Sequence, residues 1–563
     1  MRRLAGVLFL LVPALACRAE SDLPSPDFIE GSGFEMKLTA AYESIPPAGF
    51  YPVRVKAVNP SGSAKQWQIR SIQTLASSQS MSSVTSVDVP AGTTKTFDLL
   101  FPLAPDISSS SRYSNLTFRI SGPGITRGNS YASDSGTSRT PTAFLGLGEA
   151  LSVTNWGPLQ SALEKNHSQG LQGTPLDMAF MPRDWRALAG FQLIVLTGEE
   201  WRGLPAERRE ALSDWVIQGG GLILTGETTE AADLPPAGPN GTGMVEYWPD
   251  TESFATKLAN KLSGFTDAGS MRPNSNYSTG WTLAGKVGEA QSPGILILCF
   301  VVIFAIVIGP VNFLVFAPAG RRHRLFWTIP ALSLLASFLM GTYILLREGI
   351  GGSGMRYTAR LSLPAAHKLV TWQEQISRTG VLTGSSFSLP ETTLPTPLPV
   401  LEESGIRFRS RDTLTYDAGV WGGDWFKSRT TRAQLLADVS SNRERIETSS
   451  TADGVVSITS SFSNPLTEIW YIDESGKVWH GTNIKPGETL PLTPGSMGDL
   501  NIWKATVLEN AGSSLRAMVN ENYGVARGRF FATQDTNSAI NSLSSIRWKD
   551  AGGILFGEAL KKP

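Results

Sequence analysis

Cysteine and histidine are scarce in this chain, which has 563 residues but only two cysteines and four histidines. Cys17 follows the N-terminal apolar segment and Cys299 lies inside a long apolar run, so no disulfide framework can hold the remaining regions together. The four histidines are spread over four regions, and no two show the spacing of zinc ligands. We therefore expect no metal site and no cofactor.

Net charge is also lacking, because 49 basic residues balance 49 acidic ones and only 17% of the residues are charged. A nucleic-acid-binding protein carries a basic patch, so the sequence predicts no nucleic acid partner. Glycine, with 56 residues, and proline, with 35, are instead abundant. This composition is typical of exported modules rich in β-strands.

Two long apolar runs are the most informative feature that is present. Residues 294–316 (GILILCFVVIFAIVIGPVNFLVF) and 325–346 (LFWTIPALSLLASFLMGTYILL) contain no charged residue. As helices they would be roughly 33–35 Å long, enough to cross a hydrocarbon layer of about 30 Å. Arg321, Arg322 and Arg324 lie between them, and such basic turns stay in the cytoplasm. The sequence predicts a transmembrane hairpin with a cytoplasmic turn at 317–324 and both flanking regions outside.

A few polar and proline residues interrupt these runs. Pro310 frees a backbone carbonyl, which Asn312 or Thr328 could satisfy across the helix pair. Asn312 has no acidic or basic partner within the runs, so it makes no proton or ion path. Pro330 lies about as far beyond the basic turn as Pro310 lies before it. We expect them to act in topology and packing.

The N-terminus agrees with export. Arg2 and Arg3 precede an apolar segment at 4–15 and a small-residue cleavage signal at 14–16, the pattern of a signal peptide, which we place at residues 1–19. Cys17 leaves lipidation open, although the order Ala-Leu-Ala-Cys fits a lipobox poorly. The expected location is the bacterial inner (cytoplasmic) membrane, with membrane lipid as a partner and the large domains on the periplasmic or extracellular side.

Changes of periodicity divide the rest of the chain. Residues 30–140 show short strands and predict an N-terminal immunoglobulin-like β-sandwich. Residues 141–270 alternate strands with helices and predict a doubly wound α/β domain. A linker at 271–293 leads to the hairpin at 294–346, and 350–563 predicts a C-terminal β-rich exported region with a short helix at 432–439. The fold class is therefore a multidomain α+β membrane protein.

Within the α/β domain, apolar runs predict strands at 144–149, 176–182, 191–196 and 222–227. Helices are expected at 156–165 and 252–262. A further helix should begin near Pro205, because the missing N–H of proline costs little in a first turn.

One segment of this domain resembles a known family. Residues 190–226 (GFQLIVLTGEEWRGLPAERREALSDWVIQGGGLILTG) are similar to a class I glutamine amidotransferase-like domain of flavodoxin-type fold. The hairpin segments 309–316 and 321–330 resemble those of bacterial envelope membrane proteins that carry a degenerate domain of this kind. The resemblance implies the same architecture for this chain.

The expected nucleophile of that family is missing. Class I glutaminases need a cysteine on a tight turn after the strand predicted at 222–227, together with a histidine and an acid. Thr225, Gly226 and Glu227 occupy this position. Glutamine hydrolysis by a thiolate is therefore excluded, and the resemblance implies a pseudoenzyme that serves as a binding scaffold.

Three carboxylates are weak candidates for ligand binding. Glu199, Glu200 and Glu227 follow two adjacent predicted strands, where α/β folds bind ligands. They could line a small acidic crevice, or Glu199 and Glu200 could simply begin a solvated loop, which we favour. Trp421 and Trp425 flank a Gly-Gly-Asp turn and could bind glycans, but scattered aromatic residues in strands more often belong to the core.

These features predict a non-enzymatic membrane-anchored envelope protein that presents exported domains to an envelope or membrane protein partner, in a transport or envelope-maintenance complex. The alternatives are an envelope hydrolase with an unrecognised site and a module that binds glycans or small ligands. The sequence leaves the oligomeric state open.

Overall fold

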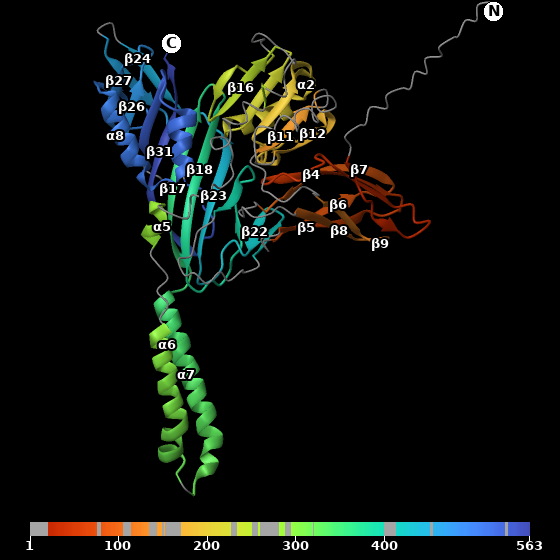
Figure 1. Ribbon diagram of the computed structural model, residues 1–563, viewed down its shortest axis with the longest axis vertical. Helices are drawn as coiled ribbons and strands as arrows, with labels where there is room; N and C mark the ends of the chain where they lie inside the picture. The colour runs from red at the N-terminus through yellow and green to blue at the C-terminus, as the bar shows by residue number, and fades with distance from the viewer. Residues whose placement is uncertain are drawn as a thin grey trace, which may run out of the picture.

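The computed structural model describes residues 21–75, 80–104, 114–133, 143–148, 151, 171–226, 233–249, 257–258, 281–287, 294–318, 320–398, 412–450, 454–534 and 539–562. Figure 1 shows a body of several β-sheets from which two long helices extend. The predicted helix at 156–165 lies outside the described residues, as does that at 252–262 apart from Lys257 and Leu258.

Two sheets form the N-terminal β unit. The first has the order β1 (Ser21–Leu23), β3 (Glu35–Ala40), β4 (Phe50–Asn59) and β7 (Thr93–Pro102). The second begins with β10 (Asn129–Ser133), β8 (Ser114–Ser121), β5 (Lys65–Leu75) and β6 (Ser80–Val89). A separate pair joins β2 (Asp27–Phe28) to β9 (Ile125–Arg127). The two sheets pack face to face, since the rings of Phe101 and Phe118 lie 5.0 Å apart in a fully buried core.

The second sheet continues with strands from the other side of the hairpin. β6 pairs in parallel with β21 (Thr413–Asp417), which is followed by β22 (Val420–Gly423) and β19 (Phe387–Ser388). Ser80 and Thr413, which are paired, are 333 residues apart in the chain. The predicted division of the chain places residues 387–423 in the C-terminal region, and no sequence pattern indicates this pairing.

The α/β unit contains a mixed sheet. Its order is β12 (Leu171–Leu176), β11 (Ala143–Gly148), β13 (Leu193–Thr197), β14 (Gly221–Thr225), β16 (Gly243–Trp248) and β15 (Gly238–Asn240). The first five strands are parallel and β15 is antiparallel. The predicted strands at 144–149, 191–196 and 222–227 are confirmed as β11, β13 and β14. The expected helix is α3 (Ala206–Ile217), with Pro205 directly before it.

The predicted strand at 176–182 is wrong. The strand is β12, which ends at Leu176, and the chain then forms the 3-10 helix η1 (Met178–Phe180). The Asp177 side chain accepts a hydrogen bond from the Ala179 N–H at 2.7 Å and so starts this turn. An aspartate that caps its own turn outweighs the apolar character of the residues after it.

The C-terminal β unit is one large sheet. Its main path is β20 (Leu394–Leu398), β23 (Thr431–Ser441), β18 (Lys368–Thr379), β17 (Gly352–Leu363), β31 (Ile546–Lys561), β30 (Arg529–Gln534), β26 (Leu466–Ile472), β27 (Val478–Ile484) and β29 (Thr493–Pro494). β24 (Ile446–Ser450), β25 (Val456–Ser460) and β28 (Thr489–Pro491) branch from it. The helix predicted at 432–439 is wrong, because these residues form β23 between β18 and β20. Two neighbouring strands override the helix propensity of the segment.

The two long apolar runs form a helical hairpin apart from the body (Figure 1). α6 (Gly294–Ile306) continues as a π-helix, η4 (Val307–Phe316), and η5 (Arg322–Arg324) leads into α7 (Leu325–Glu348). Both are long and apolar enough to cross a membrane, and their apolar side chains are mostly exposed. Before the hairpin, α5 (Thr282–Val287) packs on β17 and β18.

The hydrogen bond expected in the hairpin from Asn312 or Thr328 does not form. The π-helical segment begins three residues before Pro310. Asn312 is fully buried, yet neither its side-chain amide nor the Thr328 hydroxyl has a partner among the described residues. The backbone carbonyl of Asn312 instead accepts a hydrogen bond from the Ala317 N–H, at 2.9 Å. Pro330 lies within α7.

Candidate functional site

The carboxyl edge of the α/β sheet carries two of the three predicted ligand-binding residues. Glu199 and Glu200 lie in the first turn of α2 (Gly198–Gly203), which follows β13 directly. Glu199 is exposed and Glu200 is half-buried. Glu227, the third, lies outside the described residues. The structure therefore places two of the three predicted carboxylates at this edge.

Glu200 forms a capping box at the start of α2. Its carboxylate accepts a hydrogen bond from the Thr197 N–H at 2.8 Å, and its own N–H donates to Thr197 Oγ1 at 3.1 Å. The carboxylate also lies against Gly148 at the end of β11, where an added Cβ would be 2.2 Å from Glu200 Oε2. Glu200 thus holds together the ends of β11 and β13. The sequence contains the signal for this role, a threonine three residues before a glutamate after an apolar strand.

The residue at the position of the expected nucleophile is buried and already hydrogen-bonded. Thr225 ends β14 in a buried position, and its hydroxyl donates a hydrogen bond to the Leu196 carbonyl at 3.4 Å. Cys17 lies outside the described residues, and Cys299 is exposed on α6 of the hairpin. Neither cysteine therefore stands in a nucleophilic arrangement with the residues that the structure describes at this edge.

One acid–base pair lies elsewhere. The ring of His480 on β27 is 2.9 Å from Glu468 Oε1 on β26, and the rings of His480 and Trp470 are 4.4 Å apart. In the described part of the chain, no hydroxyl or thiol is hydrogen-bonded to this imidazole, and no group of three histidine, cysteine or acidic side chains could hold a metal ion. The pair has a carboxylate and a base but no attached nucleophile.

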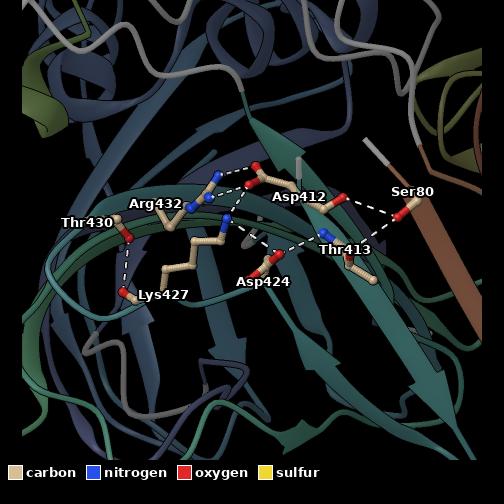
Figure 2. Close-up of polar contacts among 7 residues, drawn as sticks. All are labelled: Ser80, Asp412, Thr413, Asp424, Lys427, Thr430 and Arg432. Carbon is tan, nitrogen blue, oxygen red and sulfur yellow. Dashed lines mark hydrogen bonds and ion pairs between the residues drawn. The ribbon is translucent and has the colours of Figure 1, made fainter. Parts of the chain in front are cut away.

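Polar contacts also join the three units to one another. We call the first of them the junction cluster: Asp412, Asp424, Lys427 and Arg432, beside the start of β21 (Figure 2). Arg432 binds both oxygens of Asp412, at 2.8 and 3.1 Å, and Lys427 Nζ lies 2.6 Å from Asp412 Oδ1 and 3.4 Å from Asp424 Oδ2. A guanidinium that bridges both oxygens fixes the orientation of the carboxylate.

The junction cluster holds the strand that crosses into the N-terminal β unit. Asp424 accepts the Thr413 N–H at 2.7 Å, and the Asp412 carbonyl accepts the Ser80 hydroxyl at 3.5 Å (Figure 2). The same carbonyl also accepts the Ser80 N–H, at 2.8 Å. The cluster therefore positions the first residues of β21 for pairing with β6. Its members are separated along the chain, and no sequence motif joins them.

Acid should loosen the junction cluster. Burial alone would raise the pKa of Asp412, but hydrogen bonds and charge from Arg432 and Lys427 outweigh it and hold this pKa below its usual value. A carboxyl with a depressed folded-state pKa contributes stability above its unfolded-state pKa of about 3.9 and loses it as the pH falls through the folded-state value. We expect the protection of the β21 amides, measured against their intrinsic exchange rate at each pH, to fall below about pH 4. D412N should exchange faster at neutral pH and lose most of this acid response, whereas E199Q should match the wild type at both pH values. An unchanged D412N would contradict the assignment.

A second contact joins the N-terminal β unit to the α/β unit. Tyr42 is buried, donates a hydrogen bond to the Ala187 carbonyl at 3.2 Å, and packs its ring 5.1 Å from that of Phe191. The backbones touch at Gly49, where an added Cβ would be 2.3 Å from the Arg186 carbonyl oxygen, and at Gly190, where it would be 2.7 Å from Pro46.

A third contact joins the α/β unit to the C-terminal β unit. Lys368 on β18 lies 2.6 Å from Glu210 and 3.2 Å from Asp214 on α3. Burial raises the pKa of Asp214 despite the attraction of Lys368. All three units consequently share contacts, and one continuous hydrophobic core runs through them.

Comparisons with family models and curated proteins identify no relative of this chain. No family model matches the chain, and no curated protein matches it. Among solved structures, a cycloisomaltooligosaccharide glucanotransferase from Paenibacillus sp. is 10% identical over 33% of this chain and 27% of its own length, with a TM-score of 0.16. The yeast delta-COP-I mu-homology domain is 8% identical over 38% of this chain and 98% of its own, with a TM-score of 0.19. An exo-chitosanase from Amycolatopsis orientalis is 10% identical over 91% and 79%, with a TM-score of 0.15. Likenesses this low transfer no activity to this chain.

Proposed function

We propose that this protein is a non-enzymatic, membrane-anchored envelope protein whose exported units form one body that is presented to a protein partner. The supporting observation is the pairing of β6 with β21. These strands precede and follow the hairpin, and a sheet cannot continue through a lipid bilayer. Both flanks must therefore lie on the same side of any membrane that the hairpin crosses.

The two ends of the hairpin indicate on which side of the membrane the body lies. Arg321, Arg322 and Arg324 lie at its tip, and basic residues of this kind are retained in the cytoplasm. Phe326 and Trp327, directly after the tip, expose 86% and 80% of their surface. Exposed aromatic residues beside a basic turn favour the headgroup region of a bilayer. The body at the opposite end would then be exported.

The α/β unit supports a scaffold role. When its five parallel strands are numbered by their order in the chain, they lie in the sheet in the order 2-1-3-4-5, which is the order of flavodoxin-like folds. We therefore interpret it as a degenerate class I glutamine amidotransferase-like domain, and the N-terminal β unit as an immunoglobulin-like sandwich. With Thr225 buried and hydrogen-bonded where that family has its cysteine, the unit is proposed to bind or pack rather than hydrolyse glutamine.

The partner is proposed to be another envelope or membrane protein, within a transport or envelope-maintenance complex. The three contacts between the units would keep the exported surfaces in a fixed arrangement. A fixed surface loses little conformational entropy on binding, which favours recognition of a protein.

Reporter fusions test this topology. Alkaline phosphatase needs disulfides that form outside the cytoplasm, so it reports export. We expect active fusions after Ser270 and after Gly352, and an inactive fusion after Gly320. A complementary cytoplasmic reporter should give the reverse pattern. An active phosphatase after Gly320 would contradict the proposal.

A further inference from the structure

Three arginines converge on η1, where the N-terminal β unit contacts the α/β unit. Arg54 on β4 stacks over the Phe180 ring, with its guanidinium carbon 4.1 Å from the ring centroid. Arg208 on α3 donates a hydrogen bond from Nη1 to the Met178 carbonyl at 2.8 Å. Arg183 follows the end of η1 by three residues. We call Arg54, Arg183 and Arg208 the arginine cluster.

Arg208 is the most deeply buried member of the arginine cluster. It exposes 9% of its surface, and its Nε is buried without a hydrogen-bond partner among the residues that the structure describes. Its hydrogen bond to Met178 uses Nη1, on the other side of the guanidinium from the fork of Nε and Nη2. A buried charged donor without an acceptor is costly, and a native protein that keeps one commonly uses it for a function.

The charge around Arg208 is positive. Burial and repulsion from Arg183 and Arg54 lower the pKa of its guanidinium, and the attraction of Asp98 and Glu207 offsets only part of this. Arg54 is itself paired with Asp98, at 2.8 Å, and Arg183 with Glu207, at 3.0 Å. Three arginines thus share two carboxylates, so one further negative charge would balance this group.

The ion pair beside Arg208 is open to solvent. The side chains of Arg183 and Glu207 expose 58% and 50% of their surfaces. Exposed ion pairs contribute little stability, because both partners are well hydrated and salt screens their attraction. An incoming anion can therefore replace Glu207 beside Arg183 at small cost and reach the buried guanidinium of Arg208.

A carboxylate suits this site in shape and charge. Its two oxygens accept parallel hydrogen bonds from the fork of one guanidinium, and this geometry fixes the orientation of the ligand as well as adding energy. Its single negative charge also balances the one positive charge in excess. A phosphate monoester carries about 1.5–2 negative charges at neutral pH and would exceed it.

We propose that the arginine cluster binds a carboxylate group, with Arg208 donating from Nε and Nη2 and with Arg54 and Arg183 attracting the ligand at the surface. A small organic acid or an acidic side chain of another protein can present this group. Binding there does not require the hairpin to cross a membrane, so it is independent of the proposed function.

Hydrogen exchange of the full-length protein tests this site. Acetate is the free-carboxylate probe, a capped tripeptide with one central glutamate presents the same group on a peptide, and chloride keeps the ionic strength constant. A bound ligand reduces the opening of η1, because opening separates Arg208 from Met178. Exchange should slow by a factor of one plus the ratio of ligand concentration to Kd, which is about 11-fold at ten times Kd. We expect this at residues 177–180.

Three substitutions on α3 separate the carboxylate site from a general effect of charge. R208Q removes the guanidinium and should weaken binding at least about tenfold, so the same acetate concentration should slow exchange only about twofold. R208K keeps the charge but lacks the fork, and it should also lose most of the binding. R209Q removes the same charge from the next residue, about 100° away around the helix, and should bind acetate as the wild type does.

Two results would overturn the proposal on the wild type alone. One is acetate that slows exchange no more than chloride does. The other is inorganic phosphate that acts at a tenfold lower concentration than acetate, because the site would then select phosphate. An acetate effect of equal size in R208Q would also overturn it. Tighter binding of the peptide than of acetate would support a carboxylate presented by a protein, and the reverse would support a small ligand.

Discussion

Replacing Gly49 by alanine should separate the N-terminal β unit from the α/β unit. Gly49 has a φ of +88°, and an added Cβ would lie 2.3 Å from the backbone oxygen of Arg186. A left-handed backbone costs alanine about 1 kcal/mol, and forcing two packed backbones apart costs about 1–3 kcal/mol more. We expect the free energy of unfolding of G49A to be lower by about 3 kcal/mol, which is a large share of a typical domain stability of about 5–15 kcal/mol. The amide exchange rates of Leu188 and Phe191 should increase in the same variant.

Gly92 provides the matched control for this substitution. Its φ is +64°, and an added Cβ would meet nothing within 4 Å. G92A should therefore show the backbone cost alone, about 1 kcal/mol. Equal losses in G49A and G92A, with unchanged exchange at residues 185–191, would mean that the two units do not touch at Gly49.

Replacing Trp421 by alanine should unfold the region where β22 meets the N-terminal β unit. Trp421 exposes only 4% of its surface, and its ring lies 4.6 Å from Tyr416, 5.4 Å from Trp425 and 6.2 Å from Phe50. Truncation of a buried tryptophan costs about 3–5 kcal/mol. We expect W421A to lose this much free energy of unfolding, measured by chemical denaturation with intrinsic fluorescence as the signal.

The same substitution separates a core role from glycan binding. Trp503 on α8 (Met497–Val507) is half-buried and serves as the control, with an expected loss of about 1 kcal/mol for W503A. Trp425 is also buried, so the structure supports the core interpretation of both tryptophans. A W421A protein that folds normally but loses affinity for an immobilised glycan would reverse this conclusion.

The sequence predicted elements whose signal is local. The apolar run at 294–316 matches α6 and η4 together, and that at 191–196 matches β13, because long or uninterrupted apolar segments need no partner to be recognised. Residues 171–176 gave no such signal, since LQGTPL carries few apolar side chains at the edge of its sheet. Residues 432–439 gave a misleading one, because strong helix formers are held between two strands distant in sequence.

The contacts between units could not be predicted for the same reason. Asp412, Lys427 and Arg432 lie beside the N-terminal β unit because β21 pairs with β6, and a pairing over 333 residues leaves no periodic pattern in the sequence. Glu200 was predicted at the correct edge, but as a ligand-binding candidate. The structure gives its carboxylate a capping role, whose threonine-to-glutamate spacing is visible in the sequence.

The proposed topology requires segments before and after the hairpin to form one sheet outside the cytoplasm. Ser82 and Thr415 are paired between β6 and β21, and neighbouring strands lie about 4.8 Å apart, within the Cα separation of a disulfide. We expect S82C/T415C, in a C17S/C299S background, to form a disulfide in living cells without added oxidant, because the periplasm is oxidising. The closed loop should migrate faster on a non-reducing gel, and S82C/T482C should not. Thiols that stay reduced in S82C/T415C, or that a membrane-impermeant reagent reaches on one side only, would contradict the account.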